Sequence, residues 1–423
     1  MPETSLPAAK ASGTRFFYGF VIVAAAMVID LVMAGVHFTF GAFFTPVSGE
    51  FGWTRAATSG AFTLYSMLHG ALFILTGRIS DRFGPKPMLI VSGLFFGLGF
   101  FLMSTISAIW QIYLYYGVVV AIGMSGGFVP LMSTIARWFV KRRGLMTGLV
   151  LAGGGLGQAL FPPLSTWLIS VFEWRQAYRI FGVGVLVVLV VLALFLKRDP
   201  AQMGRSPYGS GSDASKKQLN TLPASLSLGQ AAATPQFWQY FAAIVFAQFG
   251  LGMMVVHALP HGIDLGMEAA AAATVVTTFA GVGVAARVVF GGVTDRIGGK
   301  WVMALSCVVL AISLLGMAVF RSIPAFYGLA AVFGLGFGAF VSSMSPLAAQ
   351  LFGLRHHGVI FGVATFGATI GGGLGPLMAG AIFDSTGTYA SAFVTTGALC
   401  ILAFAAVLFL KAPQVNVTTV TEK

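Results

Sequence analysis

One ten-residue pattern occurs twice in this chain, and both copies lie between long apolar stretches. Residues 77–86 read Gly-Arg-Ile-Ser-Asp-Arg-Phe-Gly-Pro-Lys, and residues 291–300 read Gly-Gly-Val-Thr-Asp-Arg-Ile-Gly-Gly-Lys. The two aspartates, Asp81 and Asp295, are 214 positions apart. Glycines of later apolar stretches repeat at the same offset, as Gly144 with Gly358 and Gly148 with Gly362. A duplicated chain in a membrane places its binding site at the interface of the two halves.

The composition is that of a protein embedded in a membrane. Of the 423 residues, 57% are hydrophobic and 9% are charged, whereas roughly a quarter of the residues in ordinary soluble domains are charged. A helix crosses a bilayer with about 20 apolar residues, so we expect an all-α membrane protein of two pseudo-symmetric six-helix bundles. The first apolar run is too long for a signal peptide and has no small-residue cleavage site, so we expect it to be retained. The twelve predicted crossings lie near 16–44, 56–77, 87–106, 110–137, 144–172, 176–196, 236–260, 270–293, 301–320, 324–352, 358–382 and 389–410.

The basic residues predict the orientation of these helices. The loops that hold Lys86, Arg142 and Lys300 all fall on one side of the predicted bundles, and the opposite side has few basic residues. Positive loops stay in the cytoplasm, so we expect both termini there and the protein in a cell inner membrane. The formal charge of +12 therefore reflects topology, and we expect no nucleic-acid partner.

A change in composition divides the chain. Residues 197–235 are rich in Ser, Gly, Ala, Pro and Lys and have no apolar periodicity, which is typical of a linker. We therefore expect the following parts: a cytoplasmic N-terminus at 1–15, a first half at 16–196, a cytoplasmic linker at 197–235, a second half at 236–410 and a cytoplasmic tail at 411–423.

The duplicated pattern resembles the loop motif of the major facilitator superfamily, which follows the second and the eighth helix of that fold. The resemblance covers nearly the whole chain. It implies twelve helices, a central site and a conformational role for the polar residues of both motifs, which pair with one another or with helix N-termini. The gating candidates are Asp81, Arg82, Asp295, Arg296, Arg137 and Arg142.

A second stretch narrows the family. Residues 137–148 read Arg-Trp-Phe-Val-Lys-Arg-Arg-Gly-Leu-Met-Thr-Gly and lead into a glycine-rich run at 152–157. This resembles the fifth-helix motif of the monocarboxylate transporters. The segment at 15–20 resembles their first-helix motif only loosely, because the acid and the tryptophan are missing. The glycine runs lack the flanking strand of a nucleotide-binding loop, so close helix packing is the better interpretation.

Arg287 is the strongest candidate for binding a substrate. It lies eight residues before Asp295, which places it ~12 Å inside the membrane from the cytoplasmic end of its helix. A permanent charge at this depth costs ~3 kcal/mol or more unless a partner receives it, and a guanidinium matches a carboxylate through two parallel hydrogen bonds. A structural ion pair with a neighbouring helix is the alternative. The resemblance implies that this arginine of the eighth helix holds the transported carboxylate.

Asp30 is the candidate for carrying a proton. The best-known animal monocarboxylate transporters have an aspartate one turn before the substrate arginine, but Gly283 stands there in this chain. Asp30 lies deep in the first predicted helix, ~20 Å from its cytoplasmic end. An intramembrane carboxylate is a proton-site candidate, since burial disfavours its charge and a nearby arginine favours it. A structural contact is the alternative.

Histidines offer rival proton or hydroxyl partners. His257 and His261 share a face of the seventh predicted helix, and His37 and His69 lie in the first and the second. We expect a role in substrate binding or proton coupling for His257, and in proton coupling for His37. No spacing supplies three converging metal ligands, so we expect no metal and no cofactor.

Four phenylalanines could form an apolar wall around a small substrate, although core or lipid packing is the better interpretation for any one of them. They are Phe38, Phe128, Phe337 and Phe361.

The sequence thus predicts a transporter and not an enzyme, because no arrangement of catalytic side chains occurs at consistent depth. One deep cation suits a monoanion, so we expect symport of a small monocarboxylate, L-lactate or pyruvate, with a proton. The alternative is an organic-anion exchanger of the same fold. The expected partners are the substrate, the proton and the lipid bilayer, and we expect a functional monomer.

Overall fold

The computed structural model describes residues 17–53, 55–210 and 225–411. Its regular elements are helices, and the described chain has one isolated bridge, between Phe139 and Tyr208. The predicted N-terminal part at 1–15, nearly all of the tail at 411–423 and residues 211–224 of the linker lie outside the described residues.

The helices form two bundles that follow one another in the chain. The first half contains α1 (Gly19–His37), α2 (Phe40–Phe51), α3 (Arg55–Phe83), α4 (Pro85–Met103), α5 (Ile109–Ile112), η1 (Tyr113–Val120), α6 (Ala121–Ser125), α7 (Phe128–Trp138) and α8 (Arg143–Ala193). The linker contains η2 (Pro200–Met203) and α10 (Leu228–Ala232). The second half contains α11 (Pro235–Asp264), α12 (Ala269–Ile297), α13 (Gly299–Val319), α14 (Ile323–Phe352), α15 (His357–Thr386) and α16 (Ala390–Leu408).

The described residues contain 11 helices that are long and apolar enough to cross a membrane, against the twelve crossings predicted. The difference lies in α8, whose 51 residues join the predicted crossings at 144–172 and 176–196. Glu173 has φ 65° and ψ 160° between them, so the helix is interrupted there. The first predicted run also needs a correction, because it continues beyond residue 44 and divides into α1 and α2.

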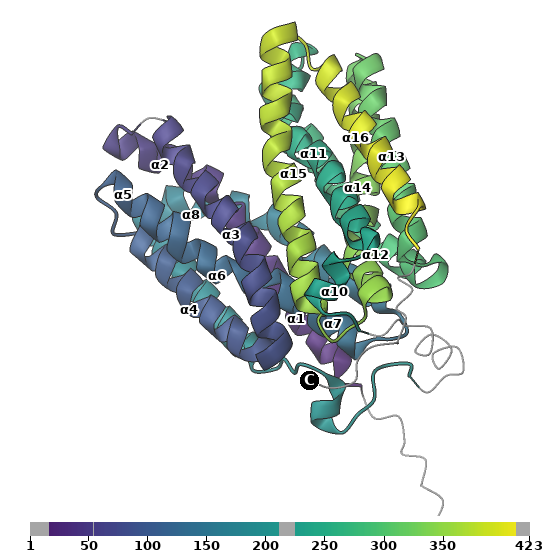
Figure 1. The fold of residues 1–423 in the computed structure, drawn as a ribbon. Coiled ribbons are helices and arrows are strands. Elements are labelled where there is room, and N and C mark those ends of the chain that lie inside the picture. Colours follow the sequence, from purple (N-terminus) through teal and green to yellow (C-terminus); the bar gives the residue numbers. More distant parts are fainter. Residues whose placement is uncertain (1–16, 54, 211–224, 412–423) are drawn as a thin grey trace, which may run out of the picture.

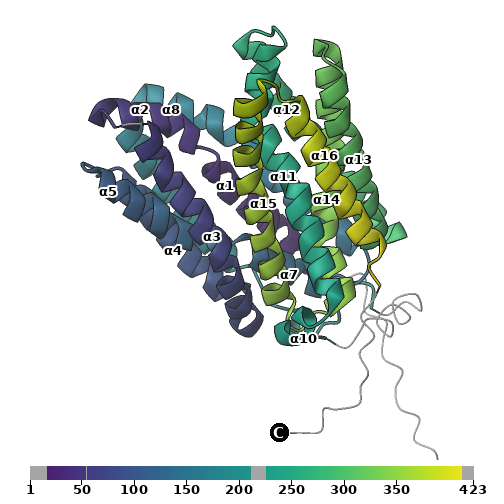
Figure 2. The same cartoon turned by 45° about the horizontal axis from the view of Figure 1, so that its top comes forward.

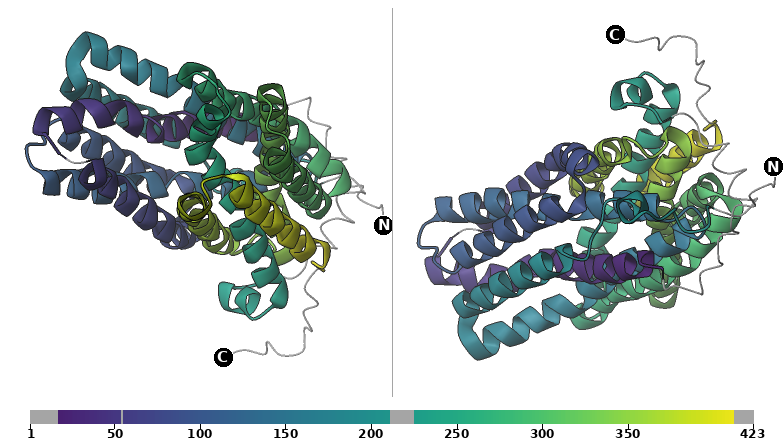
Figure 3. Two further views of the ribbon diagram at one scale, coloured as in Figure 1. Left: turned by 90° about the horizontal axis from the view of Figure 1, so that it is seen from above. Right: turned by 90° about the horizontal axis from the view of Figure 1, so that it is seen from below.

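The two bundles meet at one end and diverge toward the other (Figure 1). The meeting end carries α7, α10 and the loops that follow α3 and α12, and we call it the linker end. Figure 2 shows α3 and α15 side by side at the boundary of the halves, and the contacts agree. Figure 3 shows the two bundles next to one another from above and from below. The main contacts between the halves are α8 with α12 and α3 with α15.

Glycines make these two crossings close. A Cβ atom on Gly148 of α8 would collide with the carbonyl oxygen of Arg287 on α12, and one on Gly362 of α15 would collide with that of Phe73 on α3. Gly148 and Gly362 are duplicated positions, so the crossings correspond to one another. The sequence repeat therefore recurs as a repeat of backbone contacts between the halves.

Candidate functional site

Asp295, at the end of α12, binds the first residues of α8 in the opposite half. Its Oδ1 accepts a hydrogen bond of 2.7 Å from the amide of Gly144, and its Oδ2 accepts one of 2.9 Å from the amide of Leu145. The first amides of a helix lack intrahelical partners and carry partial positive charge, so a carboxylate is well suited to them. A polar residue of the second motif thus ties the second half to the first.

Asp81, at the end of α3, does the same for α15 in the reverse direction. Its carboxylate accepts hydrogen bonds of 3.1 Å from the amide of Gly358 and 3.0 Å from the amide of Val359. Arg137 of α7 adds an ion pair, with Nη2 2.6 Å from Asp81 Oδ1. Of the six gating candidates, Asp81 and Asp295 therefore form contacts between the halves, and Arg137 lies directly beside one of these contacts.

The other three gating candidates lie at the linker end, and their side chains form no hydrogen bond or ion pair with the opposite half within the described part of the chain. The guanidinium of Arg82 lies 5.1 Å from the ring centroid of Phe83, its chain neighbour. Arg142 has φ 63° immediately before α8, and Arg296 is exposed. The buried arginine of this run is Arg143, which donates from Nε to the carbonyl oxygen of Phe139 at 2.9 Å.

Arg287 lies on α12 at the crossing with α8, and only 9% of it is exposed. Its Nη1 donates a hydrogen bond of 2.9 Å to the carbonyl oxygen of Leu151, across the boundary between the halves. Its Nε is buried and has no hydrogen-bond partner. Because Nε and Nη2 form one edge of the guanidinium fork, this edge retains donors that a carboxylate oxygen pair would match.

Asp30 lies on α1 and is 8% exposed. It attracts Arg287 electrostatically, but no ion pair within 4.0 Å joins the two among the described residues. Two consecutive glycines of α8 lie between them, since a Cβ on Gly154 would meet the Asp30 carboxylate and one on Gly155 would meet Arg287 Nη1. The glycine-rich run of α8 thus allows an acid of the first half and a base of the second to approach from two sides.

His257 of α11 already has a partner for each ring nitrogen. Its Nε2 lies 3.0 Å from the carbonyl oxygen of Pro376, and its Nδ1 lies 3.1 Å from the hydroxyl of Tyr389. A carbonyl only accepts, so Nε2 donates to Pro376, and the tyrosine hydroxyl is the partner of Nδ1. These bonds join α11 to α15 and to the start of α16, which favours a positioning role within the second half.

His37 belongs to a separate cluster in the first half. Its Nδ1 is 2.6 Å from the hydroxyl of Tyr65, and the ring of His69 stacks on Tyr65 at 5.5 Å. His69 Nε2 is buried without a partner. His261 lies elsewhere, edge-on to Phe326 and Phe393 in the second half. The four histidines therefore form two pairs. His37 and His69 lie 6.4 Å apart beside Tyr65, and His257 and His261 both pack against Tyr389, at 5.1 and 5.8 Å between ring centroids.

The four candidate phenylalanines do not form one wall in this structure. Phe128 and Phe361, from opposite halves, have ring centroids 5.9 Å apart. Phe38 packs edge-on against His37, and Phe337 lies parallel to Phe333. Only the first pair spans the boundary between the halves, so it is the part of the predicted wall that the structure brings together.

Several partners in these contacts were not singled out in the sequence. They are Tyr65, Tyr389, Arg143 and the carbonyl of Leu151. Arg143 follows Arg142 directly, and the sequence alone does not distinguish them. In the structure Arg142 is exposed with a left-handed backbone, whereas Arg143 is buried. Within the described part of the chain, no three His, Cys, Asp or Glu side chains are grouped as metal ligands would be.

Comparisons with known proteins agree on one family. A family model described as Major Facilitator Superfamily matches residues 19–272 and 258–423. The oxalate:formate antiporter of Oxalobacter formigenes is 28% identical over 415 residues, which cover 94% of this chain and 91% of that protein. Monocarboxylate transporter 11 of Homo sapiens is 27% identical over 416 residues, covering 94% of this chain and 84% of that protein. The solved structure of the proton:xylose symporter XylE matches with a TM-score of 0.74 at 14% identity, over 93% of this chain and 96% of that chain, which is a likeness of fold.

Proposed function

This chain belongs to the major facilitator superfamily of membrane transporters and is not an enzyme, and from that premise we propose that it carries a small monocarboxylate together with a proton. L-lactate and pyruvate are the proposed substrates. The similarity to monocarboxylate transporters supports this substrate class. The proposed location is a cell inner membrane, with the linker end in the cytoplasm because the basic loops lie there.

The observation that carries this proposal is the state of Arg287. Its guanidinium is buried at the boundary between the halves, one nitrogen is held by Leu151, and Nε has no partner. A monocarboxylate would supply two acceptors to the Nε and Nη2 edge and would neutralise the charge. A group at the boundary that binds substrate can be exposed to either side as the halves rock.

Charge balance supports Asp30 as the proposed proton site. In the empty protein, ionised Asp30 compensates Arg287 across the glycines of α8. When a monoanion binds Arg287, one negative charge becomes surplus, and a proton on Asp30 removes it. Both the empty and the loaded site are then neutral, so each can change conformation without a bare charge in the membrane. We prefer Asp30 to His257 because both nitrogens of His257 are engaged.

The contacts of Asp81 and Asp295 support a gating role for the linker end. They hold the halves together there, whereas the helices diverge toward the opposite end. The described conformation would then be the one closed to the cytoplasm. Release of substrate into the cytoplasm would require these four amide contacts to break. Both halves belong to one chain, so a monomer suffices for this cycle.

The test is uptake of labelled L-lactate into proteoliposomes that contain the full chain, with and without an inward proton gradient. We expect accumulation that collapses with a protonophore. Arg287→Gln should abolish saturable uptake, whereas Arg321→Gln, at an exposed arginine of the same half, should retain it. Undiminished uptake by a folded Arg287→Gln protein would refute the assignment.

An exchanger is the second candidate, favoured by the similarity to an oxalate:formate antiporter. The same vesicles distinguish the two. Uptake that ignores the proton gradient, but accelerates with lactate or another organic acid trapped inside, would indicate exchange. Arg287 would then keep its role and Asp30 would lose the proposed proton.

A further inference from the structure

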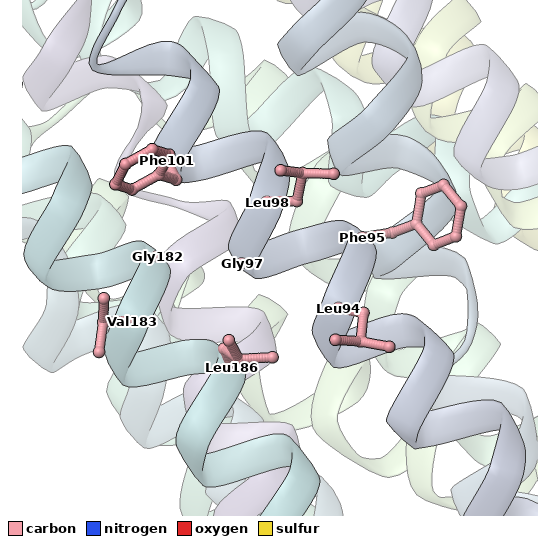
Figure 4. A pocket seen from close by; sticks show the side chains of 8 residues that line it. All are labelled: Leu94, Phe95, Gly97, Leu98, Phe101, Gly182, Val183 and Leu186. Carbon is pink, nitrogen blue, oxygen red and sulfur yellow. The ribbon is translucent and has the colours of Figure 1, made fainter.

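A groove runs along the outer surface of the first half, between α4 and the second part of α8. Its volume is about 370 Å³. Gly97 and Gly182 bring the two helices together at its base, where a Cβ on either would meet the other's carbonyl oxygen. Figure 4 shows Phe101 at one end of the groove and Leu94 and Leu186 at the other. The residues that line it are Leu94, Phe95, Gly97, Leu98, Phe101, Gly182, Val183 and Leu186.

The walls of this groove are apolar and exposed. Leu94, Leu98 and Val183 are 51%, 50% and 56% exposed. Both helices belong to segments long and apolar enough to cross a membrane. The medium around them is therefore lipid, and an acyl chain matches a narrow apolar groove that extends ~10 Å along α4 from Leu94 to Phe101.

A cation lies one helical turn beyond the groove. Arg179 precedes Gly182 by three positions, Ser104 follows Phe101 by three, and residues three apart share a helix face. Arg179 Nε donates to Ser104 Oγ at 3.2 Å, which places the guanidinium where the groove ends. Arg179 is exposed, and no carboxylate of the described residues lies within 4.0 Å of it. Its depth also fits a lipid headgroup, since Arg179 is six positions after the break at Glu173, ~9 Å along the helix.

We propose that this groove binds one acyl chain of an anionic phospholipid, whose phosphate lies on Arg179, in the leaflet at the end opposite the linker. Gln176 Oε1 accepts a hydrogen bond of 3.3 Å from Arg179 Nη1. The phosphate would therefore accept hydrogen bonds from Nη2, which neither Ser104 nor Gln176 engages. A helix from a second copy of the chain could fill the groove, but it would leave Arg179 without an anion. The charge beside the groove therefore favours a phospholipid over a protein helix.

Native mass spectrometry of the full chain in detergent tests this proposal, with phosphatidylglycerol and a diacylglycerol of the same acyl chains as probes. We expect the protein to retain phosphatidylglycerol and to release diacylglycerol. Arg179→Gln should weaken retention of phosphatidylglycerol by roughly fivefold, the value of one basic residue near an anionic headgroup, and Arg179→Lys should restore most of it.

Matched variants separate the groove from the rest of the surface. Val183→Trp should fill the groove and reduce retention, whereas Val187→Trp, at a residue 52% exposed on the same helix but outside the lining, should not. Arg321→Gln should also retain the lipid, and thermal unfolding verifies that each variant is folded. The proposal would be overturned if Arg179→Gln and Val183→Trp retained as much phosphatidylglycerol as the parent protein does. It would also be overturned if the parent bound diacylglycerol as well as phosphatidylglycerol. A change from dimer to monomer mass in the groove variants, with lipid retention unchanged, would identify a second copy as the occupant instead.

Discussion

Asp81 and Asp295, 214 positions apart, each bind the amides of the second and third residues of a helix in the opposite half. The contacts are reciprocal, since Asp295 of the second half binds α8 and Asp81 of the first half binds α15. Asp81 differs in one respect, because it also pairs with Arg137. The two contacts are therefore similar in geometry, but the contact at Asp81 also includes an ion pair.

This inequality predicts that Asp81→Asn opens the linker end more than Asp295→Asn does. Loss of the charged acceptor should cost about 1–2 kcal/mol at either helix, and at Asp81 a buried guanidinium also loses its partner, for about 3 kcal/mol or more in total. Thr294→Cys can report opening, because Thr294 is 2% exposed and lies against Gly144 of the opposite half. We expect faster labelling by a soluble maleimide in Asp81→Asn.

The control for this experiment is Asp264→Asn, an exposed aspartate at the opposite end. It should leave the labelling of Thr294→Cys unchanged. Cys307 and Cys400 are buried and can be replaced by alanine to give a clean background. Equal labelling rates in Asp81→Asn, Asp264→Asn and the parent would contradict the gating role.

Gly148→Ala should weaken the same closure by a different cause. Its added methyl group would collide with the Arg287 carbonyl oxygen, which is backbone and cannot rotate away. We expect faster Thr294→Cys labelling and reduced transport. Gly281→Ala is the matched control, because a Cβ there meets nothing within 4 Å, and a helical alanine in place of glycine stabilises by about 0.5–1 kcal/mol. If both alanine variants behave alike, close packing at Gly148 does not limit the closure.

The fold follows from the sequence more readily than the site does. The long apolar runs and the duplicated motif predict the two bundles, because each run and each copy of the motif is a continuous segment of the sequence. The break at Glu173 agrees with the predicted division between the crossings at 144–172 and 176–196, although no proline or glycine marks it.

The partners of the candidate side chains could not be predicted, because they come from distant segments. Tyr389, which binds His257, lies 132 positions further along the chain. Leu151 contributes a backbone carbonyl to Arg287, and any residue type could have supplied it. The sequence predicts close helix packing at the glycine-rich run, but only the structure reveals that Gly154 and Gly155 lie between Asp30 and Arg287.

His257→Asn should lower stability and leave the pH dependence of uptake unchanged. The imidazole joins Pro376 to Tyr389, and the loss of two hydrogen bonds should cost about 1–3 kcal/mol. Thermal unfolding in detergent measures the first effect and uptake between pH 5 and 8 measures the second, over the range where an ordinary histidine titrates, roughly pH 5–8. A flattened pH profile in His257→Asn would indicate that His257, and not Asp30, carries the coupled proton.

Asp30→Asn should separate net transport from exchange. With asparagine, the loaded site remains neutral because the substrate compensates Arg287, so lactate can still cross in both directions. The empty site would carry the bare charge of Arg287, which costs ~3 kcal/mol or more in the membrane, roughly a hundredfold in the population able to return. We therefore expect Asp30→Asn to lose gradient-driven accumulation of labelled L-lactate while it retains counterflow against unlabelled lactate trapped inside. Asp264→Asn should retain both activities, whereas gradient-driven accumulation that persists in Asp30→Asn would show that the coupled proton binds elsewhere.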